Sequence, residues 1–238
     1  MIRIGMLFRN SWQLIRADYV VILPYLISSF ILMITSRSLI GEQPLDPSGK
    51  LTKELLIFYS LGWLITLLAQ ATTIFMANKL SKKVIPDIAS SFIDTLKHFP
   101  LLSFLMIFSM LILISLGVIL SQFLKNYFVY AAIPLVMFTL VFFQLFPVII
   151  LLERTTLWNY FKLTINFIKN NISNTIRFFL SISIISLFTL LLIALLDSSG
   201  AFSKDILAPL LQGLSGASIT LISVVFYQEA KSTFSVNA

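Results

Sequence analysis

Six long apolar stretches, separated by shorter polar segments, make up most of this chain. A helix needs about 20 predominantly apolar residues to cross the hydrocarbon core of a bilayer, and each stretch is close to that length. The stretches lie at roughly residues 19–36, 55–77, 100–121, 127–152, 175–196 and 206–228. The pattern therefore predicts an all-α membrane protein with six transmembrane helices.

An amphipathic segment at residues 157–171 precedes the fifth stretch. Its apolar side chains recur at helical spacing, and its polar side chains take the opposite arc. Because apolar stretches border it on both sides, we expect this helix to lie in the membrane interface, with no aqueous protein to pack on. The apolar arc holds Leu157, Trp158, Phe161, Thr164, Ile165 and Ile168, and the polar arc holds Lys162, Asn166, Lys169 and Asn170.

The same pattern occurs twice earlier in the chain. Residues 4–16 carry Arg9, Gln13 and Arg16 at the spacing of Lys162, Asn166 and Lys169, and residues 85–97 form a weaker copy. Each copy precedes two apolar stretches, which predicts three parallel helix-hairpin repeats of about 75 to 80 residues around a pseudo-threefold axis. The alternative is that basic, partly apolar loops between spans imitate such a repeat. The predicted units are about 1–77, 78–152 and 153–238, each with one interfacial amphipathic helix, within a single membrane domain covering 1–238.

Composition supports the membrane interpretation. The chain is 58% hydrophobic and 11% charged, with a mean hydropathy of +0.96. A soluble globular domain has about 25% charged residues, so this chain is not a soluble globule. It contains no cysteine, which excludes disulfides, thiol catalysis and thiolate metal sites.

The net charge of +7 comes from basic residues that flank the apolar stretches. They do not gather on a polar domain, so we expect no nucleic-acid partner. Six spans place both termini on one side, and the positive-inside rule predicts that this side is cytoplasmic. That side would hold Arg3, Arg9, Arg16, Lys79, Lys82, Lys83, Lys97, Arg154, Lys162, Lys169, Arg177 and Lys231, and the other side Arg37, Lys50, Lys53, Lys125 and Lys204.

Groups that could perform catalysis or bind a metal are scarce. The only histidine is His98, next to Lys97 at a predicted interface, and no acidic residue lies in the middle of a span. Catalysis needs a nucleophile with a base, a carboxylate pair or a metal cluster within reach of one another. We therefore expect no enzymatic activity and no cofactor.

Polar side chains inside predicted spans are candidates for function because they are costly in lipid. Gln70 and Gln144 fall within one position of each other when the repeats are aligned, and Thr73 lies one turn from Gln70. Two interpretations remain open. The three side chains line a polar cavity, or the glutamines form an interhelical hydrogen bond of about 1 kcal/mol or less.

Small residues occupy one face of each of the last two spans. Such faces let helix backbones approach closely, so we expect these two to pack against each other. They consist of Ser183, Ser186 and Thr189 in the fifth span, and of Gly213, Gly216, Ala217 and Thr220 in the sixth.

Four basic residues occupy matching positions in two predicted interfacial helices: Arg9, Arg16, Lys162 and Lys169. Each base near an anionic leaflet contributes about 1 kcal/mol of attraction. Our hypothesis is that they form a ring that binds anionic lipid headgroups. The alternative is that these residues only enforce topology.

Three stretches of the chain resemble a known family. FPVIILLERTTLWNYFKLTINFIKNN, followed by a span that ends in SVVFYQEAK, resembles the YciC-type bacterial inner-membrane proteins and, more distantly, the membrane domain of some glycerophosphodiester phosphodiesterases. LFRNSWQLIRADYVVILPYL resembles the opening of the same family. The resemblance covers nearly the whole chain. It implies a six-span bacterial inner-membrane protein and supplies no catalytic residues.

These features lead to two functional hypotheses. The first is a non-enzymatic inner-membrane protein with a membrane-organising or lipid-interacting role, whose partners are membrane lipids. The alternative is a transporter of a small or amphiphilic solute through a polar cavity lined by Gln70 and Gln144. A continuous polar cavity at the glutamines would favour transport, and a packed apolar centre would favour the first hypothesis.

Overall fold

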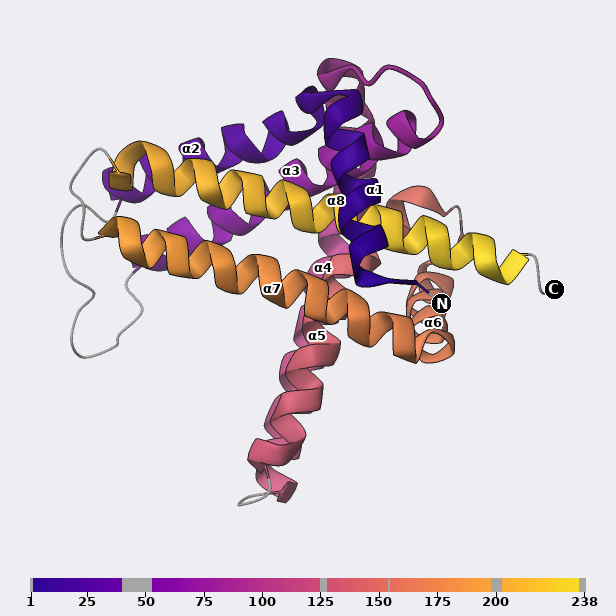
Figure 1. Cartoon of the computed structure of the whole chain (residues 1–238). Coiled ribbons are helices and arrows are strands. Elements are labelled where there is room, and N and C mark those ends of the chain that lie inside the picture. The colour runs from indigo at the N-terminus through magenta and orange to yellow at the C-terminus, as the bar shows by residue number, and fades with distance from the viewer. Residues whose placement is uncertain (1, 40–52, 125–127, 154, 198–202, 236–238) are drawn as a thin grey trace.

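The computed structural model describes residues 2–39, 53–124, 128–153, 155–197 and 203–235. These residues form helices connected by short segments (Figure 1). No strand occurs among these residues, and the predicted all-α class is confirmed. A 3-10 turn, η1 (Tyr19–Ile22), precedes α2, and a π-helical turn, η3 (Ser203–Leu207), precedes α8. The α-helices are α1 (Ile4–Ala17), α2 (Leu23–Leu39), α3 (Lys53–Ser81), α4 (Ile88–Leu124), α5 (Phe128–Leu152), α6 (Leu157–Asn170), α7 (Ile172–Asp197) and α8 (Ala208–Ser235).

Six helices in the described residues are long and apolar enough to cross a membrane, which confirms the predicted number of spans. They are α2 with its preceding turn, α3, α4, α5, α7 and α8. The remaining two, α1 and α6, have 14 residues each. At 1.5 Å per residue each is roughly 21 Å long, shorter than the hydrocarbon core of about 30 Å. Length alone therefore separates these two helices from the spans.

Four of the spans run side by side. In Figure 1, α2, α3, α7 and α8 follow one direction, and both chain termini lie at the same end of this group. We call this end the terminus end. Helix α1 crosses α8 there, and α6 lies where α7 begins and α8 ends. Both amphipathic helices thus accompany the same end of the spans.

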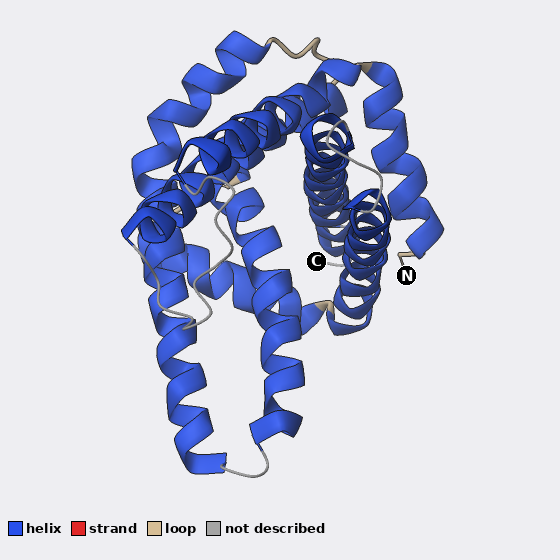
Figure 2. Ribbon diagram, turned by 90° about the vertical axis from the view of Figure 1, so that its left-hand side faces the viewer, coloured by secondary structure: helices blue, strands red, loops and turns tan. Residues whose placement is uncertain are grey.

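The α4–α5 hairpin does not run parallel to the other two. Its outer half projects across the direction of α7 and α8 in both views (Figures 1 and 2). The predicted parallel repeat concerns the order of the helices in each unit, so this difference in direction does not decide it. Apolar side chains along the outer half of α4 remain exposed, including Leu111, Ile114 and Val118.

The second helix of each hairpin lies at the centre. Helices α3, α5 and α8 contact one another. The first helix of each hairpin lies outside them and contacts the central helix of another hairpin: α2 contacts α8, α4 contacts α3, and α7 contacts α5. In addition, α1 contacts α8 and α6 contacts α5. This cyclic order is the one that three hairpin units would produce. The superposition of the three predicted units stays a prediction.

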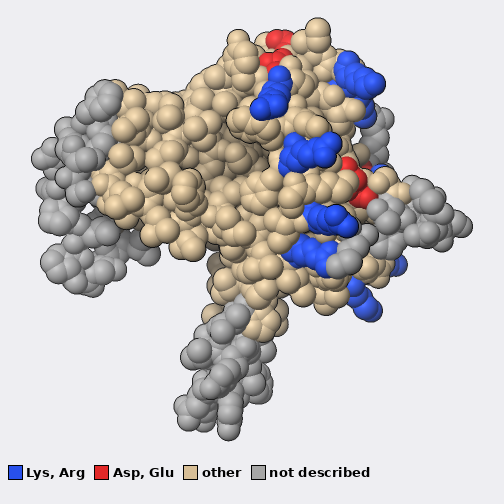
Figure 3. All heavy atoms as spheres, in the orientation of Figure 1, with Lys and Arg blue, Asp and Glu red and all other residues tan. Residues whose placement is uncertain are grey.

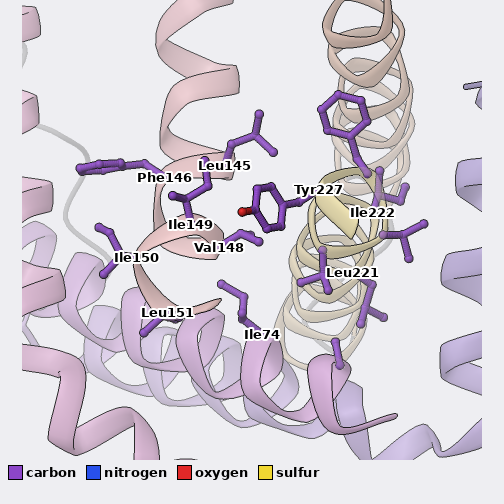
Figure 4. Close-up of a cluster of buried hydrophobic side chains, with 14 of the residues drawn as sticks. Ile74, Leu145, Phe146, Val148, Ile149, Ile150, Leu151, Leu221, Ile222 and Tyr227 are labelled. Atoms are coloured by element: carbon purple, nitrogen blue, oxygen red, sulfur yellow. The ribbon is translucent and has the colours of Figure 1, made fainter. Parts of the chain in front are cut away.

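The core is apolar and aromatic at the terminus end of these central helices. Leu145 and Ile149 of α5 face Tyr227 of α8, with Ile74 of α3 beside them (Figure 4). The rings of Phe178 and Phe226 stack with centroids 4.6 Å apart, which joins α7 to α8. Close packing of this kind holds helices together in lipid, where no hydrophobic effect separates protein from solvent.

The middle interfacial helix does not form a separate element. Residues 88–97 are the first turns of α4, a single helix of 37 residues that continues through Pro100. Its start is capped by Asp87, whose carboxylate accepts a hydrogen bond from the Ser90 backbone N–H at 2.8 Å. An interior proline removes one N–H donor and its ring crowds the carbonyl four residues earlier, which bends a helix without ending it. Helix α4 continues through Pro100 in this way, and Figure 2 shows the helices from a second side. Of the three predicted interfacial helices, α1 and α6 are separate helices.

The small-residue face of α8 packs on α2. A Cβ atom on Gly213 would lie 2.7 Å from the Ser29 Oγ and 3.0 Å from the Leu26 Cα. The expectation that the faces of the last two spans pack against each other is therefore wrong for α8. The glycines of α8 allow the close approach of α2. The small residues of α7 remain half-buried; they are Ser183, Ser186 and Thr189.

Candidate membrane-interface site

Basic side chains gather at the terminus end of the molecule. Figure 3 shows lysine and arginine concentrated on this half, over the region of α1, α6 and the end of α8. At the opposite end, the Arg37 guanidinium of α2 is paired with the Asp205 carboxylate. The asymmetry agrees with the side that the charge count in the sequence assigns to the cytoplasm.

The four predicted lipid-binding residues are exposed. Arg9 and Arg16 lie on α1, and Lys162 and Lys169 lie on α6. None of the four forms an ion pair with another described residue. The Arg16 guanidinium lies 5.7 Å from the ring centroid of Trp12, which is itself 53% exposed. The four charges are thus available to an external ligand. Their predicted arrangement as a ring around the bundle stays a prediction.

One part of the apolar arc of α6 is buried against the protein, and the other part is exposed. Tyr160, Thr164 and Ile168 are buried against the bundle, so this helix packs along one face on the membrane domain itself. The inner face of α6 follows a four-residue spacing, which is one helical turn. Its outer apolar edge remains exposed and consists of Leu157, Trp158, Leu163 and Ile165.

The N-terminal segment fastens α1 to α7 and α8. The Ile2 backbone N–H donates to Asn174 Oδ1 at 3.1 Å, and the Arg177 guanidinium donates to the Ile2 carbonyl at 2.9 Å. The Asn10 carboxamide donates to the Glu229 carboxylate at 3.0 Å. These bonds hold α1 across the ends of two spans, with its basic side chains outward.

Gln70 and Gln144 meet between α3 and α5. The Gln70 Nε2 donates to the Gln144 Oε1 at 3.3 Å, and Gln70 is 7% exposed. Thr73 is fully buried but belongs to a different contact, because its hydroxyl donates to the Val21 carbonyl at 3.5 Å. The geometry is that of an interhelical hydrogen bond. Neither glutamine lines the groove between α5, α6 and α8 or the groove between α3 and α4.

This bond makes a testable contribution to stability. We expect Gln70→Leu and Gln144→Leu each to destabilise the purified protein, because each leaves the other amide without its partner. A double-mutant cycle on unfolding in detergent should give a coupling of about 0.5–1 kcal/mol. Zero coupling would contradict a direct bond between the two amides.

A second polar cluster joins α5 to α8. Glu153 directly follows α5. Its Oε1 accepts a hydrogen bond from the Tyr227 hydroxyl at 2.5 Å and forms an ion pair with the Lys231 ammonium. The Tyr160 hydroxyl of α6 donates to the Glu153 carbonyl at 3.2 Å. Three helices therefore converge on one residue.

The Glu153 carboxyl is ionised at neutral pH. Burial raises its pKa, but the hydrogen bonds from Lys231 and Tyr227 and the charge of Lys231 outweigh burial, and the net pKa lies below the ordinary value. The pair is partly exposed, with 24% of the Glu153 side chain accessible. A stable negative charge thus lies at the end of a span.

A groove of about 250 Å³ opens beside this cluster, between α5, α6 and α8. In the sequence, Lys231 is one of the bases of the predicted cytoplasmic side, and no pattern joins it to Glu153. One signal was present, since Tyr227 and Lys231 lie one helical turn apart and Glu153 ends a span on the same predicted side. The groove is lined by Ile149, Glu153, Leu163, Asn166, Phe167, Asn170, Asn171, Tyr227 and Lys231.

No family model, curated protein or solved structure matches this chain. The resemblance to the YciC-type proteins therefore stays a prediction.

Proposed function

We propose that this chain is a non-enzymatic protein of the bacterial inner membrane that binds anionic lipid headgroups through α1 and α6. One observation carries the proposal: each short helix presents exposed basic residues beside an exposed tryptophan, Trp12 or Trp158, at one end of the spans. Helices with this composition lie in the interface plane, where apolar side chains enter the headgroup boundary and bases meet anionic lipid.

The proposal places both termini in the cytoplasm. Its support is the concentration of basic residues at the terminus end, because cytoplasmic segments carry the excess of lysine and arginine. A reporter fused after Ala238 or within residues 78–90 should report the cytoplasm, and one fused within residues 41–50 should report the periplasm. Cell-surface labelling of the C-terminus would contradict this orientation.

The lipid interaction is tested by removing the four charges. In the variant Arg9→Gln, Arg16→Gln, Lys162→Gln, Lys169→Gln, we expect less co-purified anionic lipid and less thermal stabilisation by added anionic lipid. With about 1 kcal/mol lost for each of the four bases, binding should weaken by roughly several hundredfold. Topology should be retained, because Lys79, Lys82, Lys83 and Arg154 remain.

The matched control removes bases outside the two helices. Lys82→Gln with Lys83→Gln changes exposed residues of the α3–α4 connection and should leave lipid retention nearly unchanged. If the quadruple variant keeps the anionic lipid and its stabilisation, the four bases serve only topology.

The transporter alternative requires a continuous polar cavity at Gln70 and Gln144. The two amides bond to each other, and the buried residues Ile74, Leu145 and Ile149 lie among α3, α5 and α8 (Figure 4). This packing gives the alternative no support, and we do not propose it.

A further inference from the structure

The α5–α6–α8 groove presents a carboxylate oxygen with spare capacity. Glu153 Oε1 accepts from both Tyr227 and Lys231, whereas Glu153 Oε2 accepts no hydrogen bond from any described residue. An ionised carboxylate oxygen in a partly buried position attracts a cationic donor strongly. The groove therefore offers a place for one positive group.

The same groove offers donors for a negative group. The Lys231 ammonium has three N–H donors. One of them donates to Glu153 Oε1, which leaves two for a ligand. The carboxamides of Asn166 and Asn170 are exposed and donate to no described residue. Asn171 is different, because its Nδ2 already donates to the Phe167 carbonyl at 2.9 Å. Donors for a phosphate thus lie in the same groove as the acceptor for a cation.

The walls of the groove are apolar. Ile149, Leu163 and Phe167 line it, and Leu163 continues onto the exposed apolar edge of α6. The volume of about 250 Å³ is at the lower end of the range for small-molecule pockets. It has room for a headgroup, and the acyl chains of a lipid would leave it along the exposed apolar edge.

We propose that this groove binds the phosphoethanolamine headgroup of a membrane lipid. The ammonium donates to Glu153 Oε2, and the phosphate accepts from Lys231 and the carboxamides of Asn166 and Asn170. A phosphocholine headgroup carries the same charges but has no N–H donors, and a phosphoglycerol headgroup has no ammonium to donate to Glu153 Oε2. The proposal rests on the interfacial placement of α6 but not on the four bases of α1 and α6.

The test compares two lipids with identical acyl chains. For the purified full chain in detergent, we expect phosphatidylethanolamine to bind, by native mass spectrometry and thermal shift, about tenfold more tightly than phosphatidylcholine. Glu153→Gln keeps the shape and removes the charge, and should abolish this preference. Asp94→Asn is the control, because this carboxylate pairs with Lys79 and Lys97 outside the groove.

A second variant protects the test against a folding defect of Glu153→Gln. Leu163→Trp fills the mouth of the groove from an exposed position and leaves the Glu153 cluster intact, so it should weaken binding of the lipid while the protein stays folded. Equal binding of the two lipids by the unaltered protein would overturn the proposal. So would an undiminished preference in both variants.

Two further measurements complete the test. One distinguishes a lipid headgroup from soluble phosphoethanolamine, and the other distinguishes the groove from the four bases of α1 and α6. Soluble phosphoethanolamine should compete only at far higher concentration than the lipid, and equal affinity would overturn the assignment to a lipid. The quadruple variant of α1 and α6 should keep its preference for phosphatidylethanolamine. Loss of the preference there would show that the bases, and not the groove, produce it.

Discussion

Replacing Gly213 by leucine is expected to prevent α2 and α8 from packing. Even a single Cβ at this position would lie 2.7 Å from Ser29 Oγ and 3.0 Å from the Leu26 backbone. The Leu26 Cα atom cannot rotate away as a flexible side chain does, so the helices must separate. Overpacking of this kind costs about 1–3 kcal/mol, and a leucine should reach or exceed the upper value. Gly213→Ala should produce a smaller loss.

The measurement is the folded fraction and thermal midpoint of the purified protein in detergent. Gly117→Leu is the matched control, because it introduces the same side chain in a span where a Cβ would meet only Leu135 Cδ2, at 3.9 Å. The control should remain folded. If Gly213→Leu is as stable as Gly117→Leu, the close packing of α2 on α8 is refuted.

Truncating Phe146 to alanine is expected to produce the second large loss of stability. Its ring is fully buried and lies 4.7 Å from the Phe142 ring and 4.8 Å from the Phe161 ring, between centroids. The cavity would remove contacts that join α5 to α6. Phe→Ala in a soluble core costs about 3–5 kcal/mol, and we expect roughly 2–4 kcal/mol here, since lipid lowers the transfer part of that cost.

Phe104→Ala provides the matched comparison. Phe104 lies on α4 and is 59% exposed, so its ring exchanges contacts with lipid. Reversible unfolding in detergent should show a loss well under half of that for Phe146. Equal losses would contradict the burial of Phe146 between α5 and α6. A Phe146→Ala protein that keeps its stability would contradict the contact between α5 and α6.

Local properties of the sequence were enough to predict several elements. The six spans were predictable because length and hydropathy are counted over consecutive residues. Helices α1 and α6 were predictable because their polar and apolar residues recur with the period of one helix. Gln70 and Gln144 are 74 residues apart, close to the predicted unit length, and they do meet.

The boundary of the second amphipathic segment was not predictable in the same way. Its sequence has the helical period of an interfacial helix, but whether the chain ends a helix before Pro100 or bends through it depends on the neighbours of α4. Lys79 of α3 is one such neighbour, since its ammonium donates to the hydroxyls of Ser90 and Ser91 at 3.0 and 3.1 Å. Those bonds hold the first turns of α4 against α3.

The sequence by itself determined which segments are spans and which carry the basic interfacial surface, because these are properties of short stretches. Only the tertiary structure decided that Gly213 faces Leu26, that Glu153 meets Tyr227 and Lys231, and that the α4–α5 hairpin leaves the direction of the others. Every span offers lipid-like apolar faces, and lipid exerts no hydrophobic force that selects among them. The choice of neighbour then depends on shape and on single polar contacts between distant residues, which no periodicity along the chain records.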